Sequence, residues 1–458
     1  MHWRWFRGRK EASGTFRSRH GSCAVNGGRP TGRACRWESR RPVSWRLLAA
    51  ALFAACAVGL ARCPAAEEKS TGATAGKAAE SSLEYVPLDA PAGMSQAVIV
   101  QGFPLVHTRQ LLPVDRQGKL VGEGSADAQI EQVLTNLDAL LKDSGSGLDK
   151  LVRLNIYALS PSTVTRVLEL LSKRLGATVR PAVTAVLTPM TERGALLAVD
   201  AVAAAAGGDQ EVVLKRSEAV AGQKDCADAA VLPVGGVAYL SGQPDEGGLT
   251  ESAVARSMTG LMKTLGHLNL APTQVVQLKV FLRPATSAGE VRREIQKFFP
   301  GQLTPPMVFV EWLAAVPVEI ELIAQWPISG PPGENVEYFT PPEVRPSNTF
   351  SKVALVRTER QIYISGLYAR VPSRGEAQAK YVFQQLQEIL AKTGSDMRHL
   401  VKATYSVSDD DAARWIDRTR PLIFDPMRPP AASKLMVHGV GMLGRTMTVD
   451  MIAVGSAR

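Results

Sequence analysis

The sequence predicts an α/β fold made of three tandem copies of one ββαβαββ unit. The chain is self-similar at a spacing of about 120 residues, which is too long for a solenoid and suits small domains in tandem. Each copy contains two helical stretches with apolar residues on one face, and short runs of alternating polarity typical of half-buried strands. We therefore expect mixed sheets with both helices of a unit packed on one face.

The formal charge of the chain, +10, is confined to its first part. Residues 1–46 contain twelve Arg and Lys and two acids, whereas the remainder has 41 basic and 41 acidic residues. A nucleic-acid-binding surface needs basic residues spread through the folded part, so the neutral remainder argues against nucleic acid as a partner. A basic leader without periodic apolar pattern is typical of targeting, and no folded element is expected there.

An apolar stretch follows the leader at residues 47–61. It is too short to span a membrane comfortably and has the length of a signal-peptide core. We predict a signal peptide over 47–66, cleavage near residue 66, a linker over 67–82, and an exported protein without stable membrane association. The alternative is a short membrane anchor that is retained. We also expect translation to start near Val43, which would give the signal a normal length.

Cysteine usage excludes a disulfide framework. Four of the five cysteines precede residue 66, which leaves Cys226 as the single thiol of the mature chain. The six histidines are scattered without metal-ligand spacing. No metal and no cofactor are expected, and stability must come from packing.

The first and third copies match at a constant shift of 249 residues. Val133, Leu137, Leu141 and Gly145 return as Val382, Leu386, Leu390 and Gly394. Apolar residues four apart form one helix face, and the glycine is a typical C-terminal cap. In the middle copy Asn269 stands at the capping position, and asparagine is the next-best residue for a left-handed cap.

The predicted domains are 83–207, 211–330 and 336–458. Each opens with two short strands, continues with a long amphipathic helix and a strand, and then has a second helix, expected at 161–175, 288–299 and 410–424. Two further strands close each unit.

Several of these segments resemble the RidA (YjgF/L-PSP) family. The segments are SQAV at 95–98, LSGQ at 240–243, ISG at 364–366, RPAVTAV at 180–186, RPPAASKL at 428–435, VEIELIA at 318–324 and the long run 128–157. The resemblance implies a chorismate-mutase-like fold. It also implies trimers with ligand clefts at the subunit interfaces, so three linked copies are expected to form an intramolecular pseudo-trimer that is monomeric as a chain. The alternative is three independent beads.

The resemblance also implies a chemistry that this chain lacks in part. Family enzymes hydrolyse enamines and imines to keto acids and ammonia. An arginine in the RPART motif grips the substrate carboxylate, and a glutamate on the last strand assists with acid–base work. The arginine position is Val183, Met307 and Ala432 in the three copies, and the glutamate position is Ala198, Glu319 and Thr448.

Candidate site residues follow from these motifs. Glu319 is the candidate catalytic residue. Ser241 and Gln243 are candidate ligand-binding residues, with strand-end hydrogen bonding as the alternative. Glu321 and Ser365 are further candidates. Glu321 shares one face of its strand with Glu319, and this face either lines a cleft or is solvated. An arginine lies near the start of each second helix and could replace the missing clamp or simply face water; the three are Arg166, Arg292 and Arg414. Arg109-Gln110 stands where the family has Gly-Gln.

Three functions remain open at this point. The first is a protein that binds a small metabolite, such as an imino or keto acid, in altered clefts. The second is a variant imine deaminase acting near Glu319. The third, an endoribonuclease or translation inhibitor, is disfavoured by the neutral charge beyond residue 46.

Overall fold

The computed structural model describes residues 81–458 except 88–89, 92, 329–332 and 457–458. The described residues belong to one unit of the chain, Thr74–Arg458. They form three sheets and six helices: α1 (Ala126–Asp143), α2 (Pro161–Leu175), α3 (Ala253–His267), α4 (Ala288–Gln296), α5 (Gly375–Lys392) and α6 (Asp410–Ile423). The predictions for residues 1–80, including the signal peptide, lie outside the described residues.

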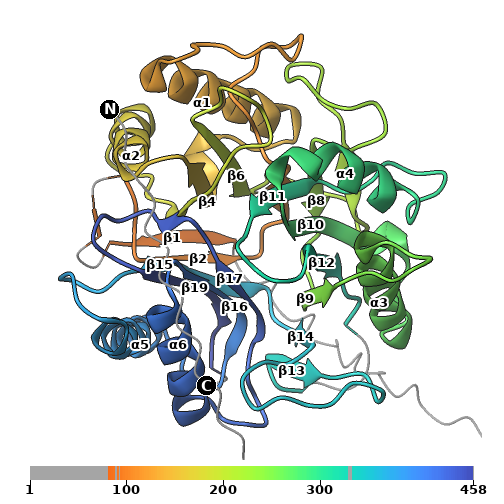
Figure 1. Ribbon diagram of the computed structural model, residues 1–458, viewed down its shortest axis with the longest axis vertical. Helices are drawn as coiled ribbons and strands as arrows, with labels where there is room; N and C mark the ends of the chain where they lie inside the picture. The colour runs from red at the N-terminus through yellow and green to blue at the C-terminus, as the bar shows by residue number, and fades with distance from the viewer. Residues whose placement is uncertain (1–80, 88–89, 92, 329–332, 457–458) are drawn as a thin grey trace, which may run out of the picture. The chain divides into compact units, whose positions relative to one another are not determined.

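The three sheets share one strand order, and we call each sheet with its two helices a module (Figure 1). Module 1 carries α1 and α2 and contains β7 (Val213–Lys215), β8 (Ala229–Leu232), β3 (Leu105–Thr108), β6 (Leu197–Ala204), β4 (Leu151–Ala158) and β5 (Ala182–Leu187). Module 2 carries α3 and α4 and contains β13 (Val336–Phe339), β14 (Val353–Val356), β9 (Val237–Asp245), β12 (Val318–Gln325), β10 (Val275–Leu282) and β11 (Met307–Glu311). Module 3 carries α5 and α6 and contains β1 (Ser82–Val86), β2 (Ala97–Gln101), β15 (Arg360–Leu367), β19 (Met447–Val454), β16 (Leu400–Val407) and β17 (Ala431–Met436).

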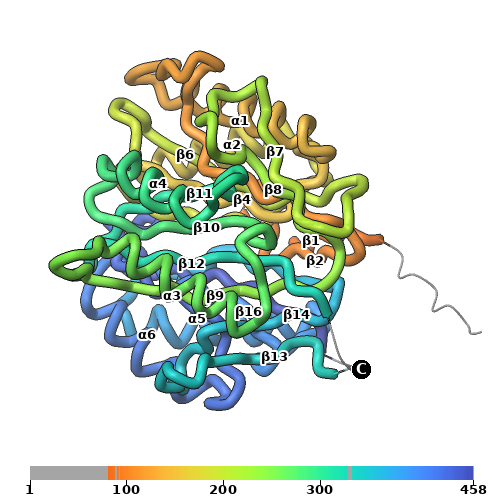
Figure 2. The backbone as a smooth tube through the Cα atoms, turned by 90° about the vertical axis from the view of Figure 1, so that its right-hand side faces the viewer, coloured from red at the N-terminus to blue at the C-terminus, as the bar shows by residue number. Residues whose placement is uncertain are grey.

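The opening strands of each repeat join the sheet of another repeat. β2 pairs with β15, β8 with β3, and β14 with β9, all antiparallel. Figure 2 shows β2, β8 and β14 from a second side. Each exchange has the same register, because Arg109, Ser241 and Ser365 each donate a backbone N–H, at 2.9 Å, to the opening segment that joins their sheet. The predicted unit placed these strands in the sheet of their own repeat, so here the structure differs. The three repeats are thereby linked in a ring of backbone hydrogen bonds.

One further short strand, β18 (Gly439–Val440), crosses between modules. It follows β17 in the chain but pairs with β5, so that Gly439 lies opposite Leu187. At the other end of β5, Ala182 forms a bridge with Ser95, which precedes β2, so module 3 contacts β5 at both ends.

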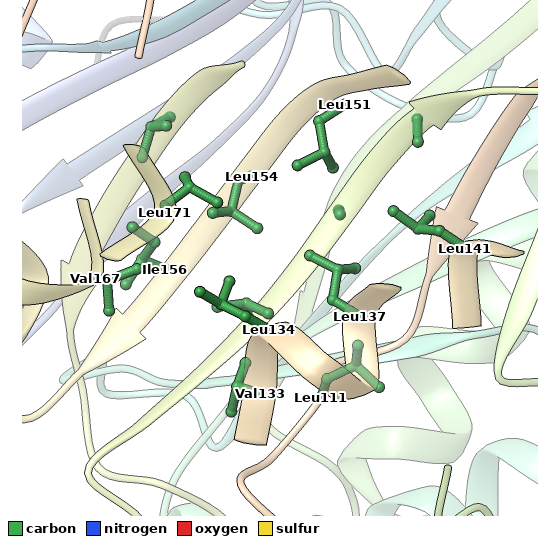
Figure 3. Close-up of a cluster of buried hydrophobic side chains, with 14 of the residues drawn as sticks. Leu111, Val133, Leu134, Leu137, Leu141, Leu151, Leu154, Ile156, Val167 and Leu171 are labelled. Carbon is green, nitrogen blue, oxygen red and sulfur yellow. The ribbon is translucent and has the colours of Figure 1, made fainter. Parts of the chain in front are cut away.

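The core of module 1 shows how the sequence pattern builds a helix on a sheet (Figure 3). Ser125 caps α1 by accepting the backbone N–H of Ala128, and Val133, Leu137 and Leu141 then point toward β4. All three side chains are fully buried. Burial of such side chains contributes about 1.5–3 kcal/mol each, so this face holds the helix on its sheet.

The ends of the first helices follow the predicted caps. Gly145 and Gly394 have φ values of 82° and 72°, and Asn269 has a φ of 56°. Asn269 is the single non-glycine residue with positive φ in the described part of the chain. The prediction of a left-handed asparagine cap in the middle repeat is confirmed.

The second helices begin as predicted, but α4 ends at Gln296 rather than near residue 299. The short edge strands β1, β7 and β13 were not predicted, because three to five half-exposed residues give little periodic signal.

A shared apolar core joins the three sheets. Val152 of β4, Val276 of β10 and Val401 of β16 occupy equivalent positions and are fully buried in one cluster. The inner faces of the sheets therefore bury one another, while each module also keeps a core of its own beneath its helices.

Candidate functional site

The sheets meet at three seams, and the seam between modules 3 and 1 is built around Ser365. Its hydroxyl donates to the carbonyl of Ser95 at 2.5 Å and accepts the backbone N–H of Val183 at 2.8 Å. Val183 is the predicted clamp position of the first repeat, and it is buried. Ser365 therefore ties two modules together at the point where the family resemblance predicts a ligand group.

The seam between modules 2 and 3 repeats this arrangement with Ser241. Its hydroxyl donates to the carbonyl of Ser351 at 2.6 Å and accepts the backbone N–H of Ala432, the third clamp position, at 2.7 Å. Gln243 has its side chain over Gly260 of α3, away from this contact. Both serine hydroxyls are occupied by backbone groups.

Glu319 is buried in the same seam. A side chain on Gly242 would clash with its carboxylate, so the glycine of the LSGQ motif leaves the space that Glu319 fills. Burial raises the pKa of Glu319 to about 7, and the neighbouring Glu321 adds to the shift, while Ser433 and Lys352 oppose it. Glu319 can therefore hold or release a proton near neutral pH, which is what a general acid–base requires.

Arg109 occupies the serine position in the seam between modules 1 and 2. From the sequence, Arg109 was expected at the position of the family glycine, one residue after the serine. The strand register instead aligns Arg109 with the serine. Its guanidinium donates to Asp228 at 2.7 Å. Gln110, the next residue, donates its backbone N–H to the carbonyl of Met307 at 3.0 Å. An arginine thus lies in a seam, but it is paired with a fully buried carboxylate, which it shares with Arg216.

Arg292 also lies at the seam between modules 1 and 2, but its environment differs from that of Arg109. Its guanidinium rests on the ring of Phe309, 5.1 Å from the centroid, two residues beyond the clamp position Met307. Burial lowers the pKa of Arg292, and Arg109 is close enough to lower it further. Among residues 81–456 that the structure describes, no acid pairs with it. Arg292 is therefore a half-buried cation without a counter-charge.

The other two second-helix arginines face water. Arg166 forms exposed ion pairs with Asp127 and Glu169, at 2.7 and 2.8 Å. Arg414 pairs with Asp411 of its own helix at 3.4 Å and is half exposed. The relocated clamp therefore has no geometric support in these two copies.

Glu321 takes part in an ion pair that crosses between modules. Lys402 of β16 donates to it at 2.5 Å, and Ser433 donates to the same oxygen. Asp200 and Asp450 occupy the equivalent positions on β6 and β19, since they lie opposite Asn155 and Thr404 as Glu321 lies opposite Lys279. Two acids of this column, Glu321 and Asp450, pair across modules, whereas Asp200 accepts Asn155 and Tyr157 of its own module. The basic partners of Asp450 and Glu321 can be seen in the sequence, because Arg153 and Lys402 align at the shift of 249 residues.

Neither a metal site nor a membrane span emerges from the described residues. No group of three His, Cys, Asp or Glu is placed to hold a metal ion in that part of the chain. None of its helices is long and apolar enough to cross a bilayer.

Comparison with known proteins identifies the family of the chain. The sequence model of the family described as endoribonuclease L-PSP matches residues 87–205 and 341–455, just over half of the chain. The chain belongs to the RidA (YjgF/L-PSP) family. The matched ranges are the first and third repeats, and the middle repeat shares their strand order.

Individual RidA-family relatives correspond to one repeat each. The RutC family protein slr0709 of Synechocystis is 28% identical over 123 residues, which cover 26% of this chain and 93% of the relative. A solved Rid-family protein from Yersinia pestis is 22% identical, with 27% of this chain and 98% of that chain covered and a TM-score of 0.25. A YjgF-family structure from Neisseria meningitidis is 18% identical, with coverages of 27% and 97% and a TM-score of 0.21.

Proposed function

We propose that this RidA-family chain is an intramolecular pseudo-trimer that binds a small carboxylate metabolite at the seam between modules 1 and 2. The observation that carries the proposal is the half-buried guanidinium of Arg292, which has no acid partner among the described residues. A cation removed from water without a counter-charge is costly, and a ligand carboxylate would offset that cost.

The surroundings of Arg292 favour a carboxylate over a bulkier anion. The guanidinium lies over the ring of Phe309 and forms no hydrogen bond with a described residue, so its N–H groups remain available for two parallel hydrogen bonds to carboxylate oxygens. Gln110 and Arg109 close the seam from module 1. A short imino or keto acid has the charge that such a site requires.

Calorimetric titration of the full chain with short 2-keto acids, pyruvate first, tests this site. We expect Arg292→Gln to weaken binding at least tenfold, since a charge-assisted bidentate contact contributes about 1.5–3 kcal/mol. Arg166→Gln, on an exposed helix face, is the matched control and should bind normally. Equal affinity in Arg292→Gln, or no binding by the unaltered chain across the series, would refute the site.

A second candidate, hydrolysis of 2-imino acids, is favoured by Glu319 in the seam between modules 2 and 3. Its carboxyl has a pKa near 7, with Lys352 beside it to balance charge. Turnover of a 2-imino acid that disappears in Glu319→Gln and persists in Glu376→Gln, an exposed glutamate, would support this activity. Absence of turnover in the unaltered chain removes this candidate and leaves the binding proposal in place.

We also propose export of the mature chain. The support is the apolar stretch at 47–61 behind a basic leader. N-terminal sequencing of protein recovered from the source cells should find a start close to residue 67. A mature protein that retains residues 47–61 would point to the membrane-anchor alternative instead.

A further inference from the structure

A central cavity lies where the inner faces of the three sheets meet. Its volume is about 50 Å³, and its lining includes His107, Arg153, Gln277, Lys279, Tyr363 and Lys402, which come from all three modules. A smaller cavity of about 20 Å³ adjoins it and shares Asn155, Lys279 and Thr404. Since one water needs about 10–15 Å³ by this measure, the central cavity has room for a few water-sized groups.

Two buried side chains in this cavity hold polar atoms without a partner. Both ring nitrogens of His107 lack a hydrogen bond within the described part of the chain, although the residue is only 1% exposed. Arg153 uses Nη1 for Asp450 and Nη2 for the carbonyls of Ile364 and Met451, while its Nε–H has no acceptor. Unsatisfied groups of this kind cost about 1–3 kcal/mol each, so they indicate an occupant.

Among the polar groups around the cavity, the ones that remain free are hydrogen-bond donors. Asp200 accepts Asn155 at one oxygen and Tyr157 at the other, so both of its oxygens are occupied. Lys402 is paired with Glu321. Lys279, in contrast, has no ion pair or hydrogen bond with any residue that the structure describes. The groups that are still free to form hydrogen bonds are therefore three donors: the ammonium of Lys279, the Nε–H of Arg153 and one N–H of His107.

We propose that the central cavity binds one small monovalent anion, of halide or formate size, through Lys279, Arg153 and His107. The three groups that remain free each offer a hydrogen-bond donor, which suits an anion rather than a metal ion. The carboxylates nearby are engaged by other groups, because Asp450 and Glu321 are in ion pairs and both oxygens of Asp200 accept hydrogen bonds. The anion would contact residues of modules 1 and 2 other than those around Arg292, so failure of either site leaves the other intact.

Bromide provides a direct probe. Crystals of the full chain grown in sodium bromide should show an anomalous scattering peak between Lys279, Arg153 and His107. A peak there in the unaltered protein supports the site. Density fitted by water only, or bromide found solely at surface positions, overturns it. This readout depends on no variant.

A solution measurement separates anion binding from general salt effects. At equal ionic strength, chloride, bromide and formate should raise the unfolding midpoint relative to gluconate, which is too large for the cavity. Lys279→Met should abolish the difference among anions, whereas Lys263→Met, at an exposed pair with Glu343, should retain it. An unchanged difference in Lys279→Met would contradict the proposal.

Discussion

Arg153 of β4 and Asp450 of β19 form a buried ion pair, 3.0 Å from Nη1 to Oδ1, that joins module 1 to module 3. Lys402 and Glu321 repeat this pair between modules 3 and 2. At the third equivalent position stands Gln277, which donates its amide to the carbonyl of Thr108 instead. Two ion pairs and one neutral hydrogen bond therefore link the three modules at equivalent places.

Removal of Arg153 should destabilise the protein strongly. Arg153→Met leaves Asp450 buried without its partner, and we expect a loss of about 3–5 kcal/mol in the free energy of unfolding. The double variant Arg153→Met with Asp450→Leu should lose much less, because no charge is then stranded. Urea denaturation followed by circular dichroism measures both, and Arg166→Met on the surface should change stability by less than about 1 kcal/mol. Equal losses in the single and double variants would contradict this reasoning.

The asparagine cap of α3 can be tested by paired substitutions. Asn269 has a φ of 56°, where a residue with a Cβ pays about 1–2 kcal/mol unless its side chain bonds locally. We expect Asn269→Ala to lower the free energy of unfolding by about 1 kcal/mol and Asn269→Gly to leave it nearly unchanged. Thermal unfolding of the three proteins under one condition gives the comparison. A larger loss for the glycine variant would show that the asparagine side chain, rather than the backbone angle, is decisive.

Glu319 should make stability depend on pH. The pKa of its carboxyl rises from 4.5 to about 7 on folding, so between these values the native state binds the proton more tightly than the unfolded state. Stability from this group is present below pH 4.5 and is lost as the pH rises through 7. The loss is on the order of 3 kcal/mol from 1.36 kcal/mol per pKa unit.

Glu319→Gln should remove this dependence. The variant should be more stable than the unaltered chain at pH 8 and similar to it at pH 5, as measured by denaturant titration at both values. The exposed control Glu376→Gln should leave the pH profile unchanged. A profile that stays the same in Glu319→Gln would show that the carboxyl keeps an ordinary pKa.

The exchanged strand β2 should hold module 3 together. Val98 is fully buried between Tyr85 and Tyr363 of the neighbouring strands, so Val98→Asp would bury an unpaired charge. We expect faster amide hydrogen exchange in β15, residues 360–367, although β15 is far from residue 98 in the sequence. Val234→Asp, at a partly exposed loop position, is the control. Exchange that increases only in β3, the next strand along the chain, would contradict the observed pairing.

Much of the local structure could be predicted because its causes are local. A helix face is defined by spacing alone, as for Val133, Leu137 and Leu141. A helix cap is marked by a residue that tolerates positive φ, as for Asn269. The candidate site was less predictable. One position of the repeats is an arginine in all three copies, namely Arg166, Arg292 and Arg414. The sequence around these three does not show that, among them, only Arg292 lies without a counter-charge.

The sequence by itself determined the three repeats, the order of their helices and strands, and the absence of an arginine at every clamp position. The tertiary structure decided which sheet each opening strand joins and which charges meet between modules. The physical reason is that a strand edge offers the same backbone donors and acceptors to any partner of matching register. The choice between β3 and β15 as the neighbour of β2 therefore depends on packing among residues far apart in the chain.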